Sequence, residues 1–165
     1  MKPDSVTFVN VLSACCHAGL VDEGRKYFNS MSQCYQITPV IEHYGCMVDL
    51  VGCAAHLEEV KDLISKMPIT PDAIVWGCFL GACIIHKNTE LGEYAAEHLF
   101  ELDWKNAATY VVLSNIYASV GQWDGIEKLR KTMKDRGIKP MAGCSWIEVN
   151  KRVHAFLARN GLHPL

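Results

Sequence analysis

Apolar residues recur along this chain at helical spacing, and the whole pattern repeats at intervals of 36, 32 and 34 residues. Each repeat opens on an aromatic residue, and further apolar residues follow three and six positions later. The four aromatic residues are Phe8, Tyr44, Trp76 and Tyr110. Such self-similarity, at a period of roughly 20–50 residues, is typical of proteins built from stacked repeats. The pattern therefore predicts a repeat protein in which these four rings lie in the core between helices.

Each repeat is expected to fold as two antiparallel helices, because turn-forming residues divide it in half. The first helices are predicted at approximately 6–17, 42–54, 73–86 and 107–119, and the second at approximately 21–32, 57–67, 89–102 and 123–136. Thr89 and Asp124 are suited to cap the helices that they open. Second helices are expected to stop at Pro39, Pro68 and Pro140, since proline does not continue a helix.

The predicted fold class is all-α, a right-handed α-solenoid of about four helix-turn-helix repeats, because two helices alone cannot bury both of their apolar faces. Four abutting units account for the helical part: 5–40, 41–72, 73–106 and 107–140. Two β-rich runs flank a polar turn within residues 141–165 and predict a short C-terminal β-hairpin. A lone hairpin is marginally stable in water, so it is expected to pack on the helices or to open a further domain.

Composition excludes several classes of protein. Half of the residues are hydrophobic, which argues against disorder. The longest apolar run, residues 73–85, is shorter than the roughly 20 residues that cross a membrane, and no targeting segment is visible at the N-terminus. The eight cysteines include no Cys-x-x-Cys pair. We therefore expect buried, reduced thiols in an intracellular compartment, and no metal site or cofactor.

Charge is divided unevenly along the chain. Residues 1–125 carry 7 Lys and Arg against 15 Asp and Glu, whereas residues 126–165 carry 9 against 3. Six of the basic residues follow one another closely on the last predicted helix: Lys128, Arg130, Lys131, Lys134, Arg136 and Lys139. Two interpretations remain open for this row, a solvated outer helix face or a surface for RNA phosphates or an acidic partner.

At this point the sequence resembles a known family. Segments 3–8, 12–15 and 17–24 resemble the long-type repeat of plant pentatricopeptide repeat (PPR) proteins of the PLS class, and residues 41–50 resemble the short-type repeat. Residues 73–106 and 107–140 are similar to the first and second extension motifs of that class. Residues 143–149, Gly-Cys-Ser-Trp-Ile-Glu-Val, resemble the box that opens a DYW deaminase domain.

The resemblance implies a protein of mitochondria or chloroplasts that binds single-stranded RNA and takes part in cytidine-to-uridine editing. Repeats of this kind read one base each through two or three side chains, which in this family are the fifth and last residues of a repeat. Carried over, these are Val9 and Val40 in the long-type unit, and Gly45 and Asp72 in the short-type unit. Cys53 and His56 stand where family members commonly carry arginine.

Catalysis by the chain itself is not expected. A zinc deaminase needs a His-x-Glu and a Pro-Cys-x-x-Cys, but His56-Leu57-Glu58 is the only His-x-Glu and no Cys-x-x-Cys follows. A deaminase supplied in trans is therefore the implied partner, and no small-molecule substrate or membrane partner is expected. The other histidines, His17, His43 and His86, are expected to cap or pack helices.

An alternative function comes from a second resemblance. Tyr110 to Leu129 also resembles a tetratricopeptide repeat, a module that binds peptides. On this interpretation residues 73–158 recruit a deaminase as a pure protein adaptor, and RNA is read elsewhere.

Overall fold

The computed structural model describes residues 2–139, 143–149 and 152–157. This part of the chain contains eight helices and two strands. The first helix of each pair is α1 (Ser5–Ala18), α3 (Ile41–Cys53), α5 (Ala73–Ile85) or α7 (Ala107–Ser119). The second is α2 (Val21–Cys34), α4 (Leu57–Ser65), α6 (Thr89–Leu102) or α8 (Trp123–Asp135). All eight predicted helices are present, and the predicted all-α solenoid of four helix pairs is confirmed.

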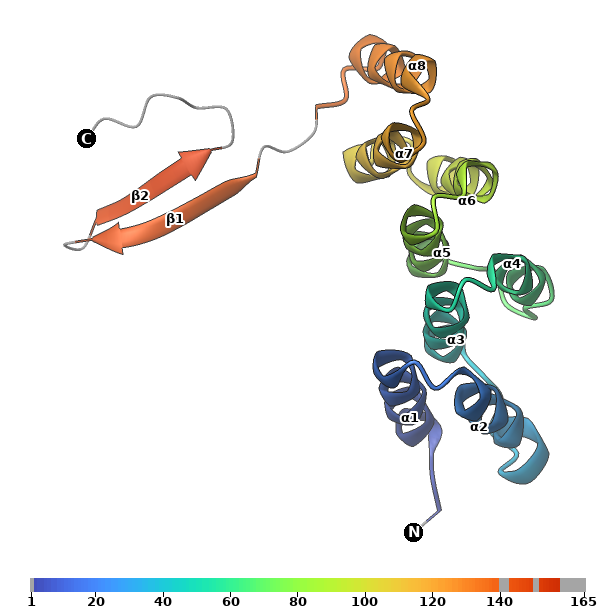
Figure 1. Cartoon of the computed structure of the whole chain (residues 1–165). Coiled ribbons are helices and arrows are strands. Elements are labelled where there is room, and N and C mark those ends of the chain that lie inside the picture. Colours follow the sequence, from blue (N-terminus) through green and yellow to red (C-terminus); the bar gives the residue numbers. More distant parts are fainter. Residues whose placement is uncertain (1, 140–142, 150–151, 158–165) are drawn as a thin grey trace.

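The helices form two layers that curve into an arc (Figure 1). The first helices pack on one another in order, α1 on α3, α3 on α5 and α5 on α7. Each second helix packs on its own partner, and α2, α4 and α6 also pack on the next first helix. The first helices therefore make a continuous layer, whereas the second helices stand apart from each other as ridges on the opposite side.

The four repeating aromatic residues occupy equivalent buried places, which confirms the prediction for them. Phe8, Tyr44, Trp76 and Tyr110 are at most 8% exposed. Phe28 of the first pair meets the ring of Tyr44 at 5.2 Å between centroids. In the same way, Phe100 of the third pair meets Tyr110 at 4.4 Å. The aromatic period thus becomes a set of contacts between successive repeats.

Helix caps differ in part from the prediction. Asn88, and not Thr89, caps α6, because its side chain accepts a hydrogen bond from the Leu91 N–H at 3.0 Å. Asp124 is the second residue of α8 and does not cap it; the preceding residue, Gln122, makes no side-chain cap either. Second helices also end several residues before the prolines, at Cys34, Ser65 and Asp135. Pro140 lies outside the described residues.

Histidines have the packing and capping roles expected of them. His43 is fully buried, its Nδ1 accepts from the Val40 N–H at 3.1 Å, and its Nε2 lies 2.9 Å from the Ser5 carbonyl oxygen. The ring proton therefore resides on Nε2 and is donated to α1. His86 Nε2 lies 3.0 Å from the carbonyl oxygen of Gly52 at the end of α3. Both rings join neighbouring repeats, whereas His17 bonds within its own helix.

Cysteines are free thiols at all seven positions where the structure describes them. Cys15 and Cys83 are buried as predicted, but Cys34 and Cys53 are exposed. The prediction of uniformly buried thiols is therefore wrong for these two, since Cys34 ends α2 and Cys53 ends α3, where the helix face turns toward solvent.

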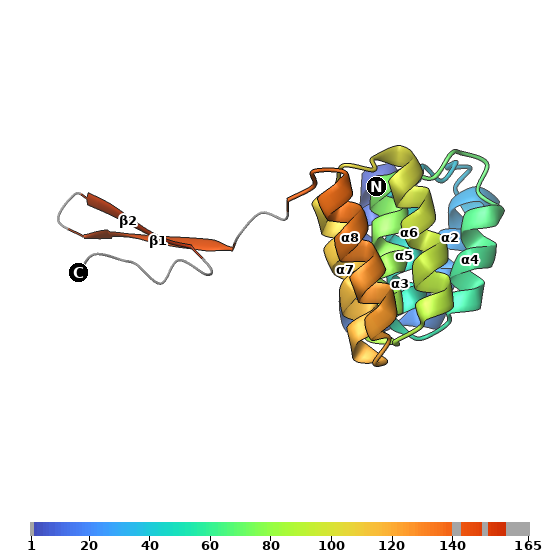
Figure 2. The same ribbon diagram turned by 90° about the horizontal axis from the view of Figure 1, so that it is seen from above.

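The C-terminal hairpin stands away from the helices (Figure 2). Strand β1 (Cys144–Val149) pairs with β2 (Arg152–Leu157) in antiparallel register, with Trp146 opposite Ala155. Trp146, Ile147 and Val153 are exposed. The hairpin itself is confirmed, and packing on the solenoid is not observed among the described elements. Among the described helices, none has the length and apolar character to cross a membrane.

Candidate nucleic-acid interface

A hollow of about 380 Å³ opens on the layer of first helices, where α1, α3 and α5 lie side by side. Three of the four predicted base-reading residues line it, Val9 from α1, Gly45 from α3 and Asp72 just before α5. The remaining lining residues are Ile41, Glu42, Cys46, Asp49, Ile74 and Cys78. The fourth predicted residue, Val40, is exposed at the start of α3 and does not line this hollow.

Asp72 has two tasks in this geometry. Its Oδ1 accepts hydrogen bonds from the N–H groups of Ile74 and Val75, both at 3.0 Å, and so caps α5. Among the described residues, Oδ2 has no hydrogen-bond partner. A carboxylate held by one oxygen at a helix start presents the other as a fixed acceptor. That acceptor suits an N–H or amino group on a base edge.

Gly45 and Val9 shape the space beside this acceptor. A Cβ added at Gly45 would meet no atom within 4 Å, so the glycine leaves the hollow open rather than fitting a close helix contact. Val9 is half-buried on the neighbouring helix and offers an apolar surface. The hollow therefore combines room for a planar ring, an apolar side and a carboxylate acceptor.

A carboxylate that the sequence analysis missed lies in the same hollow. Asp49 accepts a hydrogen bond from the Cys16 thiol at 2.9 Å across the α1–α3 contact, and the Cys53 thiol lies 3.7 Å away. Its position four residues after Gly45 is the available signal, since residues four apart share a helix face. Burial, followed by the hydrogen bond to Asp49, raises the pKa of Cys16 to about 12. Asp49 thus sits among neutral donors.

The protonated thiols predict that the protein loses stability in alkali. Burial raises the pKa of Cys83 to about 12, against 9.0 for a free thiol. A raised pKa in the folded state stabilises the protein below pH 9, and this contribution is lost as the pH rises toward 12. We expect the free energy of unfolding, measured by urea denaturation at constant ionic strength, to be level near pH 8 and to fall above pH 9. Cys83→Ala should fall less steeply; equal slopes for the two proteins would contradict the assignment.

The predicted basic row lies elsewhere. All six side chains are exposed on or just after α8, in the layer of second helices. Arg136 is partly engaged, because its Nη1 donates to the Tyr110 hydroxyl at 3.0 Å and its guanidinium lies over the Trp104 ring. The structure therefore does not bring the basic row and the base-reading hollow together.

Metal chemistry gains no support from the described part of the chain. It contains no group of three or more His, Cys, Asp and Glu side chains placed to hold an ion. His56 and Glu58 of the His-x-Glu match flank the start of α4, where Glu58 belongs to the first turn. Carboxylates favour that position because of the helix dipole.

Comparison with known proteins agrees with the repeat pattern. Residues 6–35 match the PPR repeat model, and residues 86–148 match the E motif model. A mitochondrial pentatricopeptide repeat-containing protein of Arabidopsis thaliana is 51% identical over 99% of this chain and 26% of its own length. A chloroplastic relative from the same plant is 46% identical over 99% of this chain and 19% of its own length. The chain spans about a quarter of the length of these relatives.

Solved structures share the fold. The crystal structure of the pentatricopeptide repeat protein PPR10 from maize superposes with a TM-score of 0.74 at 19% identity, over 85% of this chain and 20% of PPR10. PPR10 in complex with an 18-nucleotide psaJ RNA element gives a TM-score of 0.72 at 18% identity, over 85% and 21%. The chain thus contains a PPR repeat and an E motif, and its relatives are plant pentatricopeptide repeat proteins.

Proposed function

We propose that this chain is a single-stranded RNA-binding segment of an organellar factor for cytidine-to-uridine editing. The observation that carries the proposal is the convergence of Val9, Gly45 and Asp72 on one hollow of the first-helix layer. The maize PPR10 structure with bound RNA supports it by analogy of fold. Mitochondrial and chloroplastic relatives support a place in one of these organelles.

The division into motifs is part of the same proposal. Residues 5–40 and 41–72 serve as long-type and short-type repeats, residues 73–106 and 107–140 as the two extension motifs, and residues 141–165 as the start of a DYW domain. The match to the E motif at residues 86–148 supports the extension part. Deamination is then carried out by a DYW domain outside these residues, in the same chain or in trans.

Recognition of a base in the hollow rests on complementary hydrogen bonding. The free Oδ2 of Asp72 accepts from an N–H or amino group of a base, while Val9 contacts the base face. One bidentate side-chain contact to a base discriminates by about 1–3 kcal/mol. A segment with so few reading positions binds RNA weakly by itself, and its contribution is to selectivity within a longer array.

Replacing Asp72 by asparagine tests the proposal, because asparagine caps a helix as well as aspartate. We expect unchanged thermal stability but a changed base preference, with relative affinities shifting by on the order of tenfold. Filter binding at low salt would use four 12-nucleotide single strands, each enriched in one base. Glu58→Gln removes the same charge from the second-helix layer and should leave the preference unchanged. Identical profiles for the two variants, or no RNA binding by the parent, would overturn the assignment.

A further inference from the structure

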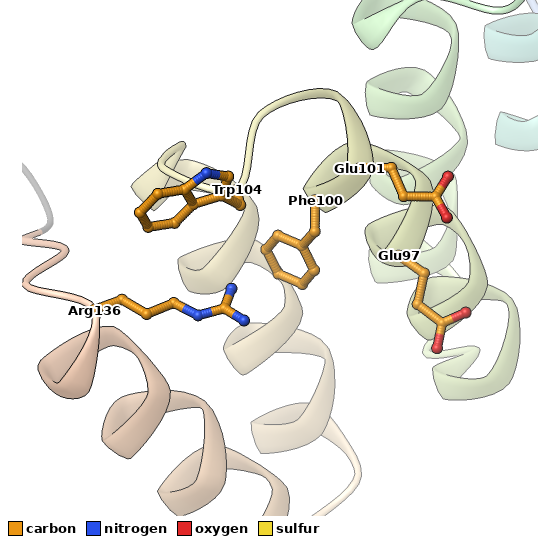
Figure 3. Close-up of a pocket in the computed structure, with 5 residues that line it drawn as sticks. All are labelled: Glu97, Phe100, Glu101, Trp104 and Arg136. Atoms are coloured by element: carbon orange, nitrogen blue, oxygen red, sulfur yellow. The ribbon is translucent and has the colours of Figure 1, made fainter.

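A long groove runs between α6 and α8 on the layer of second helices, over α7 (Figure 2). Its two halves are hollows of about 660 Å³ and 570 Å³. The first is lined by Glu97, Phe100, Glu101, Trp104 and Arg136 (Figure 3). The second is lined by residues that include Glu93, Tyr117, Trp123 and Lys128. Because both halves contain residues of α6 and α8, the groove follows the full length of these helices.

The two walls of the groove carry opposite charge. Four exposed glutamates recur about once per turn along α6: Glu90, Glu93, Glu97 and Glu101. The facing helix contributes Lys128 near one end and Arg136 at the other. In Figure 3 the carboxylates of Glu97 and Glu101 lie on one side of Phe100 and the guanidinium of Arg136 on the other. The groove is thus acidic along one edge and basic along the other.

Side chains bridge the corresponding grooves between earlier second helices. Arg25 of α2 forms two hydrogen bonds with Glu59 of α4, at 2.9 and 2.6 Å. Lys61 of α4 lies 5.0 Å from the ring centroid of Tyr94 on α6. Between α6 and α8, no ion pair or hydrogen bond crosses within residues 2–139. This groove is therefore the one of the three that remains open, although its walls are complementary.

Aromatic side chains lie at both ends and along the floor. Trp104 is 44% exposed and Trp123 is 68% exposed, a large apolar area on a water-facing surface. Tyr117 donates a hydrogen bond to Glu93 at 2.7 Å and fixes the floor against the acidic wall. Exposed tryptophans beside arginine are the side chains that most often dominate binding energy at protein interfaces.

We propose that this groove binds an amphipathic α-helix of a partner protein, with basic residues along one edge and acidic residues along the other. The basic edge pairs with the glutamates of α6, the acidic edge pairs with Lys128 and Arg136, and apolar side chains between them contact Trp104 and Trp123. Charges spaced one per turn on the acidic wall match the turn of a partner helix lying parallel to it. The 13 residues of α8 correspond to a partner helix of about 20 Å.

This surface is independent of the base-reading hollow. The hollow lies on the first helices and the groove on the second, so RNA and a partner helix can be bound at the same time. Single-stranded RNA is the competing occupant, because it would use the basic residues of α8 and stack on the tryptophans. The acidic wall of α6 disfavours RNA by repelling phosphates, and so charge complementarity selects the helix.

The test uses the full chain and three designed 14-residue helical peptides with the same leucine face. One peptide carries lysine on one edge and glutamate on the other, the second carries lysine on both edges, and the third glutamate on both. Fluorescence anisotropy of the labelled peptides at 50 mM salt should show the mixed-edge peptide binding at least tenfold more tightly than either other peptide. Both end-to-end orientations are covered, since reversing the helix only exchanges its edges.

Variants of the protein locate the site. Glu97→Lys with Glu101→Lys should weaken the mixed-edge peptide at least tenfold, and Trp123→Ala, at an exposed position, should weaken it severalfold. Glu23→Lys with Glu58→Lys makes the same change in charge on α2 and α4 and should have no effect. Equal binding of the three peptides, equal losses in the two double variants, or displacement of the peptide by a 12-nucleotide single-stranded RNA would overturn the proposal.

Discussion

Replacing Gly52 by alanine is expected to lower the free energy of unfolding by about 1–3 kcal/mol, the usual range for overpacking a core. Gly52 lies in α3 where that helix meets α5, and an added Cβ would stand 2.7 Å from the Cβ of Ala82. A Cβ is fixed to the backbone, so no side-chain rotation relieves this contact. The two helices must separate, and the hydrogen bond from His86 to the Gly52 carbonyl oxygen is strained with them.

Gly45→Ala is the matched control, because it makes the same chemical change in the same helix. No atom lies within 4 Å of a Cβ built there, and alanine is favoured over glycine in a helix by about 1 kcal/mol. Gly45→Ala should therefore stabilise the protein while Gly52→Ala destabilises it. Urea denaturation followed by circular dichroism would measure both. Changes of the same sign would show that helix propensity, and not the α3–α5 approach, governs Gly52.

The helix pairs follow from the sequence because each aromatic-led unit repeats the same apolar spacing. The helices predicted at 107–119 and 89–102 coincide with α7 and α6. Prediction is less accurate at helix ends, which depend on single side-chain hydrogen bonds. Asn88 caps α6 in place of Thr89 because its oxygen, one residue earlier, is in position to accept from the Leu91 N–H.

The candidate site was predictable only as far as the resemblance reached. Val9, Gly45 and Asp72 came from family positions, and the structure places them around one hollow. Asp49 could not be assigned from sequence because its contact with Cys16, 33 positions away, depends on how α1 packs against α3. The same holds for the α6 glutamates: their spacing is visible in the sequence, but their facing of α8 is a property of the packed layers.

The two layers therefore carry different information. First helices pack closely, and their exposed edge is shaped by residues at helix starts such as Asp72. Second helices stand apart, and what lies between them is decided by bridging side chains such as Arg25 or by their absence. The last groove is open because Glu93 bonds to the floor residue Tyr117, and Arg136 bonds to Tyr110 of α7, instead of to each other's helix.

Replacing Tyr110 by alanine is expected to lower the free energy of unfolding by about 3–5 kcal/mol, as for other fully buried aromatic residues. Tyr110 is 1% exposed and its ring packs on Phe100. Its hydroxyl donates to the Trp104 carbonyl oxygen at 3.0 Å and accepts from Arg136 at 3.0 Å. Removal leaves a cavity between the third and fourth helix pairs and frees both the 103–106 turn and the end of α8.

Tyr110→Phe separates the ring from the hydroxyl, since it keeps the packing and loses both hydrogen bonds; a loss of about 1–2 kcal/mol is expected. Each repeat contacts only its neighbours, so the effect should be local. Hydrogen exchange followed by mass spectrometry should show faster exchange in α7 and α8 for Tyr110→Ala, with α1 and α2 unchanged. Uniformly faster exchange along the chain would mean that the four helix pairs unfold as one unit and that Tyr110 supports the whole stack.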